Sequence, residues 1–274
     1  MPLRERLYKY DQSVVKILGT EKNKKIKIIT MKTLRTAGLD FFEEEHNYKS
    51  ENLVRGSINE NKLEQSISRT KNSIYELAFC NEWDYFFTAT LDKEKYPRDN
   101  LKLFRKNLTQ YIRDQNKIHN YNIKYLLIPE LHQDGKSWHM HGFLSGLPPE
   151  QLKKFKIGDK MGKKIAEKVK QGEEVFSWIG YSKKFGFCDL EKIKDHDAVS
   201  KYVMKYITKE LGKCVTALNE NMYFHSQGLN KAKIVAKGTM SLNIAPNFVG
   251  EYCCISELPY SDKMLSKILN NISS

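Results

Sequence analysis

Two histidines separated by one residue, His139 and His141, lie in the segment SWHMHGFL. Side chains two positions apart in an extended strand point to the same face. The segment before it carries Glu130 and His132 at the same spacing, and an Asp-Gly pair at 134–135 predicts a hairpin turn between the two strands. Two imidazoles and one carboxylate on a shared face could hold a divalent metal ion with open coordination positions. Glu130 and His132 compete for the third ligand position, and the alternative is an ordinary polar strand face.

A second set of reactive side chains lies in YVMKYITK, residues 202–209. Tyr202 and Tyr206 are four residues apart and therefore neighbours on one face of a helix. Lys205 and Lys209 follow them at three-residue offsets, and a nearby ammonium group favours the phenolate over the phenol. A phenolate can attack phosphorus and keep the phosphate as a tyrosyl ester, while a metal ion polarises the phosphodiester. The alternative is a pair of amphipathic tyrosines that cover the edge of a core.

Hydrophobic spacing predicts the elements that must position these residues. Strands are expected within 25–32, 84–91, 124–132, 138–146, 174–182 and 185–193, and helices within 59–81, 98–117, 153–170 and 195–211. Asp99 or Asn100 would cap the helix at 98–117, and Asp195 or Asp197 the helix at 195–211. The order of elements predicts an α+β fold with an antiparallel sheet and helices packed on one side.

The chain of 274 residues has a formal net charge of +13 and a pI near 9.3, so its surface should attract polyanions. Nucleic acid is the first candidate partner, and an anionic membrane surface is the second. Lys153 and Lys154 begin a lysine-rich segment, 153–170, that could contact phosphates. Trp138 could stack on a base, although aromatic residues in strands more often belong to the core.

The sequence contains no apolar run long enough to span a bilayer, and its first residues lack the apolar core of a signal peptide. The five cysteines are scattered, with no pair at C-x-x-C spacing: Cys80, Cys188, Cys214, Cys253 and Cys254. They predict reduced thiols rather than a disulfide framework or a zinc knuckle. A cytoplasmic protein without a membrane partner is expected.

Three segments together resemble the motifs of the HUH endonucleases: FFTATL, then PELHQDGKSWHMHGFL, then YVMKYITK. The chain is most similar to the rolling-circle replication initiators of phages and plasmids, and the paired tyrosines resemble those of small single-stranded DNA phages. The resemblance covers 83–211 and extends to 59–230. It implies an endonuclease domain over 59–230, an N-terminal extension over 1–58, and a C-terminal segment, 231–274, packed on the same domain. The fold it implies is a central antiparallel β-sheet flanked by helices.

The resemblance also implies roles for individual residues. His139, His141 and Glu130 would hold Mg²⁺ or Mn²⁺. Tyr202 and Tyr206 would be the nucleophiles, with Tyr202 making the opening cleavage. Lys205 would steady the phosphate or the leaving group, while Lys209, Lys153, Lys154 and Trp138 would contact DNA.

The activity that the resemblance implies is nicking of a single-stranded or extruded origin in a bacterial host's cytoplasm. The enzyme would keep the 5′ phosphate and leave a 3′ hydroxyl for a host polymerase. The segment nearest to a phosphate loop, GDKMGKK, is one residue short and lacks the following Ser or Thr, so no nucleotide site is predicted. A host helicase or supercoiling would then open the duplex. Two alternatives remain: an HUH transposase or relaxase, and a non-enzymatic basic DNA-binding regulator with a structural metal.

Overall fold

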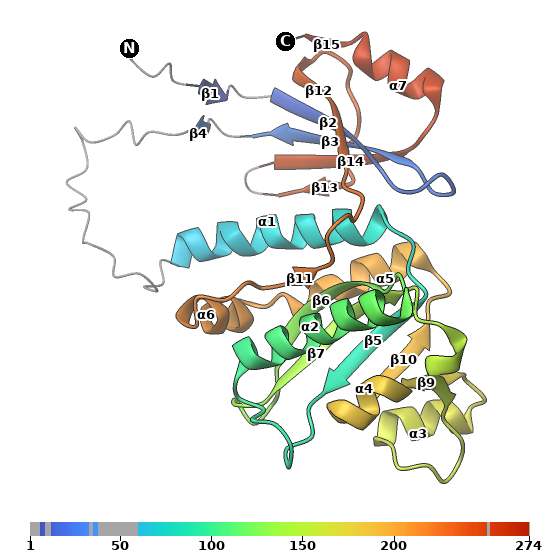
Figure 1. Ribbon diagram of the computed structural model, residues 1–274. Coiled ribbons are helices and arrows are strands. Elements are labelled where there is room, and N and C mark those ends of the chain that lie inside the picture. The colour runs from blue at the N-terminus through green and yellow to red at the C-terminus, as the bar shows by residue number, and fades with distance from the viewer. Residues whose placement is uncertain (1–5, 9–11, 33–34, 38–59, 251–252, 274) are drawn as a thin grey trace, which may run out of the picture. The chain divides into compact units, whose positions relative to one another are not determined.

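The computed structural model describes residues 6–8, 12–32, 35–37, 60–250 and 253–273 (Figure 1). The chain divides into two compact units, Arg55–Leu229 and Met1–Val54 with Asn230–Ser274. Each unit contains an antiparallel sheet and at least one helix, so the predicted α+β class with sheets flanked by helices is confirmed. The sequence over 36–57 contains an acidic patch and has the composition of a loop, and it lies mostly outside the described residues.

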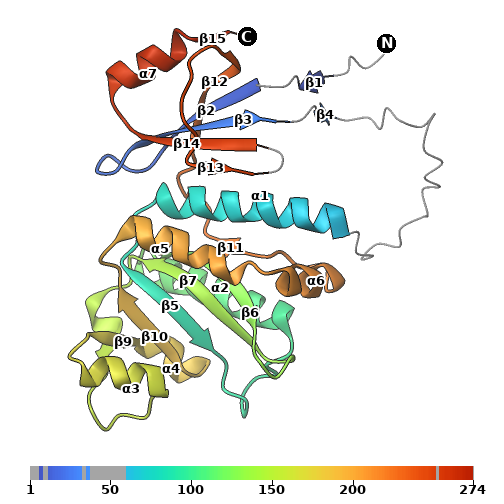
Figure 2. The same cartoon turned by 180° about the vertical axis from the view of Figure 1, so that it is seen from behind.

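The unit Arg55–Leu229 is built on a seven-stranded antiparallel sheet in the order β11-β6-β7-β5-β10-β9-β8 (Figure 2). Its strands are β5 (Tyr85–Thr90), β6 (Lys124–Leu131), β7 (Trp138–Ser145), β8 (Leu152–Lys154), β9 (Val175–Trp178), β10 (Cys188–Lys192) and β11 (Phe224–His225). The helices are α1 (Glu60–Phe79), α2 (Leu101–His119), α3 (Lys163–Lys170), α4 (Ile179–Lys184), α5 (His196–Tyr202) and α6 (Lys209–Ala217), with short 3-10 turns η1 (Pro149–Gln151) and η2 (Val203–Tyr206).

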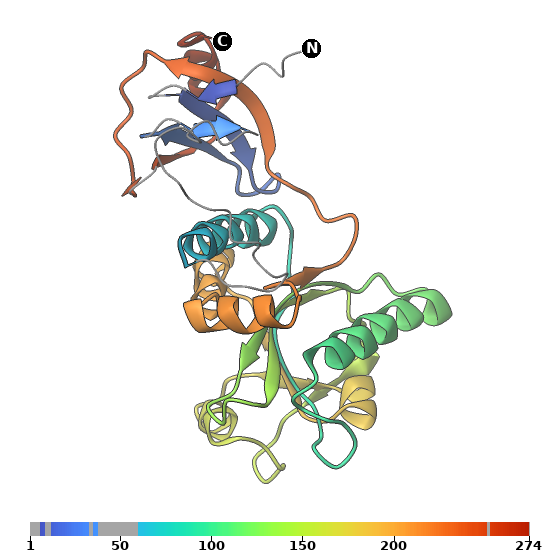
Figure 3. The same ribbon diagram turned by 90° about the vertical axis from the view of Figure 1, so that its left-hand side faces the viewer.

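Helices cover both faces of this sheet, so the prediction of helices on one side is wrong. Figure 3 shows α2 and α4 on one side and α1, α5 and α6 on the other. Adjacent residues of β5 explain this arrangement because they point to opposite faces. Phe87 is fully buried and meets Tyr181 of α4 edge-on, whereas Phe86 meets Tyr202 and Tyr206. Each face therefore carries aromatic surface that needs a helical cover.

The predicted hairpin between β6 and β7 is confirmed, with Glu130 opposite His139 in the register. Asp134 stabilises the turn, since its Oδ1 accepts hydrogen bonds from the backbone N–H groups of Lys136 and Ser137, both at 2.8 Å. Gly135 has a φ of +70°, a conformation that glycine adopts without steric cost. The turn chemistry thus fixes the register on which the histidine face depends.

The helix predicted over 195–211 is interrupted. Asp195 caps α5 as expected, accepting a hydrogen bond from the Ala198 N–H, but the α-helix ends at Tyr202 and continues as η2. Ile207 leaves the helical region, and the Thr208 side chain then caps α6. Thr208 offers the backbone a cap in place of a continuous helix, which the apolar spacing alone does not reveal. Asn100 caps α2 as predicted.

Two other predicted elements are shorter than expected. Only 163–170 of the lysine-rich segment is helical, and 152–154 forms strand β8. The strand expected over 174–182 ends at Trp178, where α4 begins.

The other unit contains a six-stranded antiparallel sheet in the order β13-β14-β3-β2-β12-β15. Its elements are β2 (Gln12–Leu18), β3 (Lys25–Met31), β12 (Lys233–Met240), β13 (Phe248–Val249), β14 (Cys253–Pro259), α7 (Asp262–Leu269) and β15 (Ile272–Ser273), with a separate pair β1 (Arg6–Tyr8) and β4 (Arg35–Ala37). Val15, Ile26, Ile28 and Ile268 form its core. The predicted N-terminal extension and C-terminal segment thus share one sheet, because β12 and β14 pair with β2 and β3.

Candidate active site

Three adjacent strands of the larger sheet bring the predicted metal-binding residues onto one face. His141 lies opposite Thr88 of β5, and His139 lies between Thr90 of β5 and Glu130 of β6. Residues directly opposite each other in an antiparallel pair share a face. The histidines, the carboxylate and both threonines therefore point the same way.

Each histidine has its Nδ1 atom next to a threonine hydroxyl. The Nδ1 of His141 lies 3.4 Å from Thr88 Oγ1, and the Nδ1 of His139 lies 3.2 Å from Thr90 Oγ1. An Nδ1 occupied in this way orients the ring and leaves Nε2 for another partner. Burial, followed by the nearby His141 and His132, lowers the pKa of His139 to about 4, so its ring is neutral at physiological pH.

Glu130 meets His141 directly, with Oε2 2.6 Å from Nε2. His141 is 8% exposed, and its Nε2 has no hydrogen-bond partner of acceptable alignment. The contact with His141 lowers the pKa of Glu130 despite the opposing effect of burial. His132 instead stacks on His139, with ring centroids 4.9 Å apart, and its Nδ1 lies 3.8 Å from Asp134 Oδ2. Of the two competitors for the third position, Glu130 is the one beside His141 Nε2.

The imidazole nitrogens and the carboxylate oxygens on this face are ligands that bind divalent cations, but the side chains are not gathered around a common point. Within the described part of the chain, no three histidine, cysteine or acidic side chains are gathered so that they could hold a metal ion. The features that fit a metal are the poorly aligned, buried Nε2 of His141 and the carboxylate oxygen beside it. The Glu130 side chain is 45% exposed, so it has room to change rotamer.

Tyr206 packs directly against the histidine face. Its ring stacks on His141 with centroids 4.3 Å apart and an interplanar angle of 7°. Phe86 lies beside both rings, 6.3 Å from His141 and 6.2 Å from Tyr206. The segment with the predicted nucleophiles therefore lies on the same face as the predicted metal ligands.

The two tyrosines have different environments. Tyr202 is 48% exposed, whereas Tyr206 is half-buried, and their rings meet edge-to-face at 6.0 Å. Burial acts to raise the pKa of Tyr202, but hydrogen bonds with Lys205 and Tyr206 lower it overall. Burial and the hydrogen bond with Tyr202 raise the pKa of Tyr206. Lys205 Nζ lies 3.5 Å from the centre of the Tyr202 ring and 4.9 Å from that of Tyr206. Tyr202 is thus the more accessible and the more acidic phenol.

The predicted DNA-contacting residues are not gathered at this site. Lys209 pairs with Glu64 at 3.1 Å, Lys153 with Asp159 at 3.8 Å, and Lys154 with Glu174 at 2.6 Å. Trp138 is 3% exposed and belongs to the core, so its ring is not accessible to a base.

The residues that support the histidines are not among those predicted from the sequence. Thr88 and Thr90 alternate along β5 with the same period of two as the histidines on β7, and that shared period was the available signal. Asp189 of β10 lies opposite Thr88 and is buried. Burial and the nearby Glu191 raise the pKa of Asp189 to about 7, against a hydrogen bond from Thr88 that lowers it. Nothing in the sequence pairs β10 with β5, so this carboxyl could not be anticipated.

Comparison with known proteins gives one finding about this region. Residues 84–211 match the family model described as replication-associated protein ORF2/G2P. The matched stretch runs from the start of β5 to the beginning of α6 and contains every residue of the site described above. No curated protein and no solved structure matches the chain. The similarity is consistent with a protein that acts in the initiation of DNA replication and binds DNA.

No helix in the part of the chain that the structure describes has the length and apolar character needed to cross a membrane.

Proposed function

We propose that this protein is a metal-dependent, site-specific endonuclease and strand transferase that acts on single-stranded DNA. It nicks a replication origin through a 5′-phosphotyrosine intermediate and thereby starts rolling-circle replication. The observation that carries the proposal is the stacking of Tyr206 on His141, which brings the two-tyrosine segment to the histidine face. The similarity of residues 84–211 to replication-associated proteins supports it.

Tyr202 is the better nucleophile for the first cleavage, because it is exposed and its pKa is lowered. Its hydroxyl loses a proton, and the phenolate oxygen forms a bond to the phosphorus of a DNA phosphodiester. The bond between phosphorus and the 3′ oxygen breaks, and that oxygen takes up a proton to become a free 3′ hydroxyl. The other strand end remains linked to Tyr202 as a 5′-phosphotyrosine ester.

Lys205 contributes to this step through its charge. Its ammonium group lies over the Tyr202 ring, and it favours the phenolate before attack. The same charge can stabilise the negative charge that develops on the phosphoryl oxygens. Tyr206 helps to lower the pKa of Tyr202 through their hydrogen bond. In the proposed reaction Tyr206 would make a second transfer, which can release a closed circle.

His139, His141 and Glu130 would hold the divalent ion, Mg²⁺ or Mn²⁺. When bound, that ion would polarise a phosphodiester oxygen and so favour attack at phosphorus. Thr88 and Thr90 orient the two rings through Nδ1, which keeps Nε2 directed to a ligand. A host helicase would open the duplex, since this sequence contains no phosphate loop. A host polymerase would then extend the 3′ hydroxyl.

Two other functions use the same residues. An HUH transposase or relaxase would carry out the same transfer on a different DNA, and the genes beside this one would distinguish it. A basic regulator with a structural zinc needs four closed ligands. The accessible and acidic Tyr202 favours an enzyme over that regulator.

The proposal is tested with labelled single strands that tile the replicon encoding the protein, incubated with Mn²⁺. A covalent protein–DNA band on a denaturing gel is expected with one tile and should disappear with EDTA. Absence of a band with every tile, under conditions where a related initiator reacts, would contradict the proposal.

A further inference from the structure

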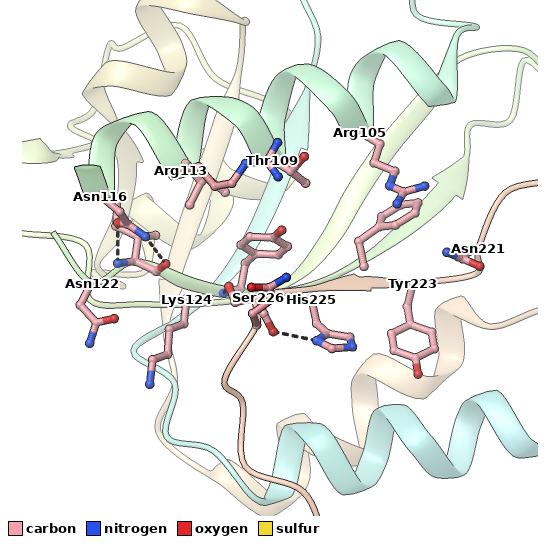
Figure 4. A pocket seen from close by; sticks show the side chains of 15 residues that line it. Arg105, Thr109, Arg113, Asn116, Asn122, Lys124, Asn221, Tyr223, His225 and Ser226 are labelled. Atoms are coloured by element: carbon pink, nitrogen blue, oxygen red, sulfur yellow. Dashed lines mark hydrogen bonds between the residues drawn. The ribbon is translucent and has the colours of Figure 1, made fainter. Parts of the chain in front are cut away.

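A pocket of about 550 Å³ opens between helix α2 and the edge strand β11, at the opposite end of the sheet order from β8. We call it the edge pocket; Figure 4 shows Arg105, Thr109, Arg113, Lys124, Tyr223 and His225 among the residues that line it. None of the candidate catalytic residues lines it. Its volume lies within the range of small-molecule and cofactor sites.

The charge of the edge pocket is of one sign. Arg105, Arg113 and Lys124 contribute positive charges to its lining, and no aspartate or glutamate lines it. Arg105 is neutralised by an ion pair with Glu220 at 2.8 Å. Arg113 donates a hydrogen bond to Gln110 at 2.8 Å, and neither Arg113 nor Lys124 forms an ion pair with a described residue. Two cations without a carboxylate partner make the pocket a site for anions.

Helical spacing aligns the basic side of the edge pocket. Arg105, Thr109 and Arg113 are spaced four residues apart on α2, so they lie along one face of the helix (Figure 4). Burial raises the pKa of Tyr125, which also lines the pocket, and the charges of Arg113 and Arg105 partly counteract this rise. Arg113, which has no ion-pair partner among the described residues, therefore places its charge within the pocket.

Strand β11 supplies rings on the side away from α2, where the Lys124 side chain also lies (Figure 4). Tyr223 and His225 flank Phe224 on the chain and stack on each other, with centroids 5.9 Å apart and an interplanar angle of 22°. Both residues are partly buried, and His225 Nδ1 is occupied by the Ser226 carbonyl oxygen at 2.8 Å. Phe224 is buried under the Arg105 guanidinium, 4.7 Å from its ring centre. A strand that passes over this edge of the sheet can therefore place a planar base on Tyr223 and His225, with one phosphate at Lys124 on the same side and another at Arg113 on the side of α2.

We infer that the edge pocket binds one or two nucleotides of a single DNA strand, with phosphate at Arg113 and Lys124 and a base against Tyr223 and His225. Phosphate together with an unstacked planar base is the chemistry that cations and exposed rings recognise. A duplex offers the phosphates but keeps its bases stacked, so a single strand fits better. The choice of DNA rests on the proposed function. The inference adds a second contact with the strand, away from the cleavage site.

Binding is measured by fluorescence anisotropy with two probes of equal length, a short oligothymidylate and an abasic deoxyribose-phosphate strand. The protein is the full chain with Tyr202→Phe and Tyr206→Phe, in EDTA, so that cleavage plays no part. Into this background are placed Arg113→Gln with Lys124→Gln, and separately Tyr223→Ala with His225→Ala. The matched control is Lys102→Gln with Lys117→Gln, two lysines of α2 that do not line the edge pocket.

Replacing Arg113 and Lys124 with glutamine should weaken binding of both probes by about tenfold. It should also make the slope of log affinity against log salt shallower by about 1.4, at about 0.7 for each lost phosphate contact. Replacing Tyr223 and His225 with alanine should weaken binding of oligothymidylate by about fivefold or more and leave binding of the abasic strand unchanged. The control should change binding by less than about twofold, which is the loss expected when no direct contact is removed.

Equal losses in the control, or unchanged binding in both pocket pairs, would overturn the inference. So would displacement of the probe by polyglutamate as readily as by unlabelled oligothymidylate, since an acidic peptide would then be the better ligand. A thermal melt confirms that each variant is folded, and Arg113→Lys with Lys124→Arg should restore binding. These assays do not require cleavage, so a failure of the proposed nicking activity is read separately.

Discussion

The two faces of the seven-stranded sheet differ sharply, although their residues alternate along the same strands. One face carries Phe87, Met140 and Trp138, each at most 3% exposed, and Phe87 meets Tyr181 of α4. The other carries Phe86, His139 and His141, under the two-tyrosine segment. The second face also contributes buried apolar residues to the core, among them Ile128 and Phe143, and it adds the histidines that could do chemistry. A shift of register by one residue would exchange the two roles.

Replacing both Tyr202 and Tyr206 with phenylalanine should have the largest effect on the polar face. Loss of both nucleophiles removes covalent chemistry, so adduct formation should fall by about a thousandfold or more. Binding to single-stranded DNA should be retained, because no charge or large apolar area is lost. Denaturing gels measure the first quantity, and anisotropy the second. Normal adduct formation by the double variant would show that the nucleophile lies elsewhere.

Phe87→Ala and Phe86→Ala compare the two faces at adjacent positions. Phe87 is fully buried, so its truncation should cost about 3–5 kcal/mol of unfolding free energy. Phe86 is only partly buried and contacts His141 and both tyrosines, so its truncation should cost less stability but reduce adduct formation. Urea unfolding and the gel assay give the two readings. Equal stability losses would remove the distinction between the faces.

Thr88→Val and Thr90→Val remove the hydroxyl groups that contact the histidine Nδ1 atoms. Since such outer contacts orient metal-binding imidazoles, the affinity for Mn²⁺ should fall by about 10–100-fold. Isothermal titration calorimetry measures it. Thr239→Val, at an exposed strand position of the other unit, is the control and should leave Mn²⁺ binding unchanged. Unaltered affinity in the Thr88 and Thr90 variants would argue against their orienting role.

Lys205→Met should have a smaller effect, which depends on pH. Lys205 lowers the pKa of Tyr202, so its loss should raise that pKa and shift the rising limb of the rate profile to higher pH. The nicking rate should fall by about fivefold or more at neutral pH, which corresponds to about 1 kcal/mol, and recover under alkaline conditions. Lys209→Met is the control, because Lys209 pairs with Glu64. Identical profiles for the two variants would contradict a role for Lys205.

The sequence predicted the local features of the site well. A period of two placed His139 and His141 on one face, and the Asp-Gly turn correctly predicted the hairpin that brings Glu130 to them. The interruption of the last helix at Ile207 was missed, because the capping hydroxyl of Thr208 competes with helix continuation and the apolar spacing does not record this. Tyr202 and Tyr206 remain neighbours because η2 keeps them within one turn.

Features that depend on distant pairing could not be predicted. Strand β12 pairs with β2, although more than 200 residues separate them in the sequence. The edge pocket combines Arg113, Lys124 and Tyr223 from three segments, none of which has a recognisable motif. Trp138 points away from His139 because adjacent strand residues face opposite ways, and its burial follows from the helices that cover that face.

Attack of Tyr202 on DNA at the histidine face can be observed by mass spectrometry of tryptic peptides from the covalent adduct formed with Mn²⁺. We expect a nucleotide-modified peptide in which the modification maps to Tyr202. A modification that maps to a residue remote from His139 and His141, or a DNA break with no modified peptide, would contradict it.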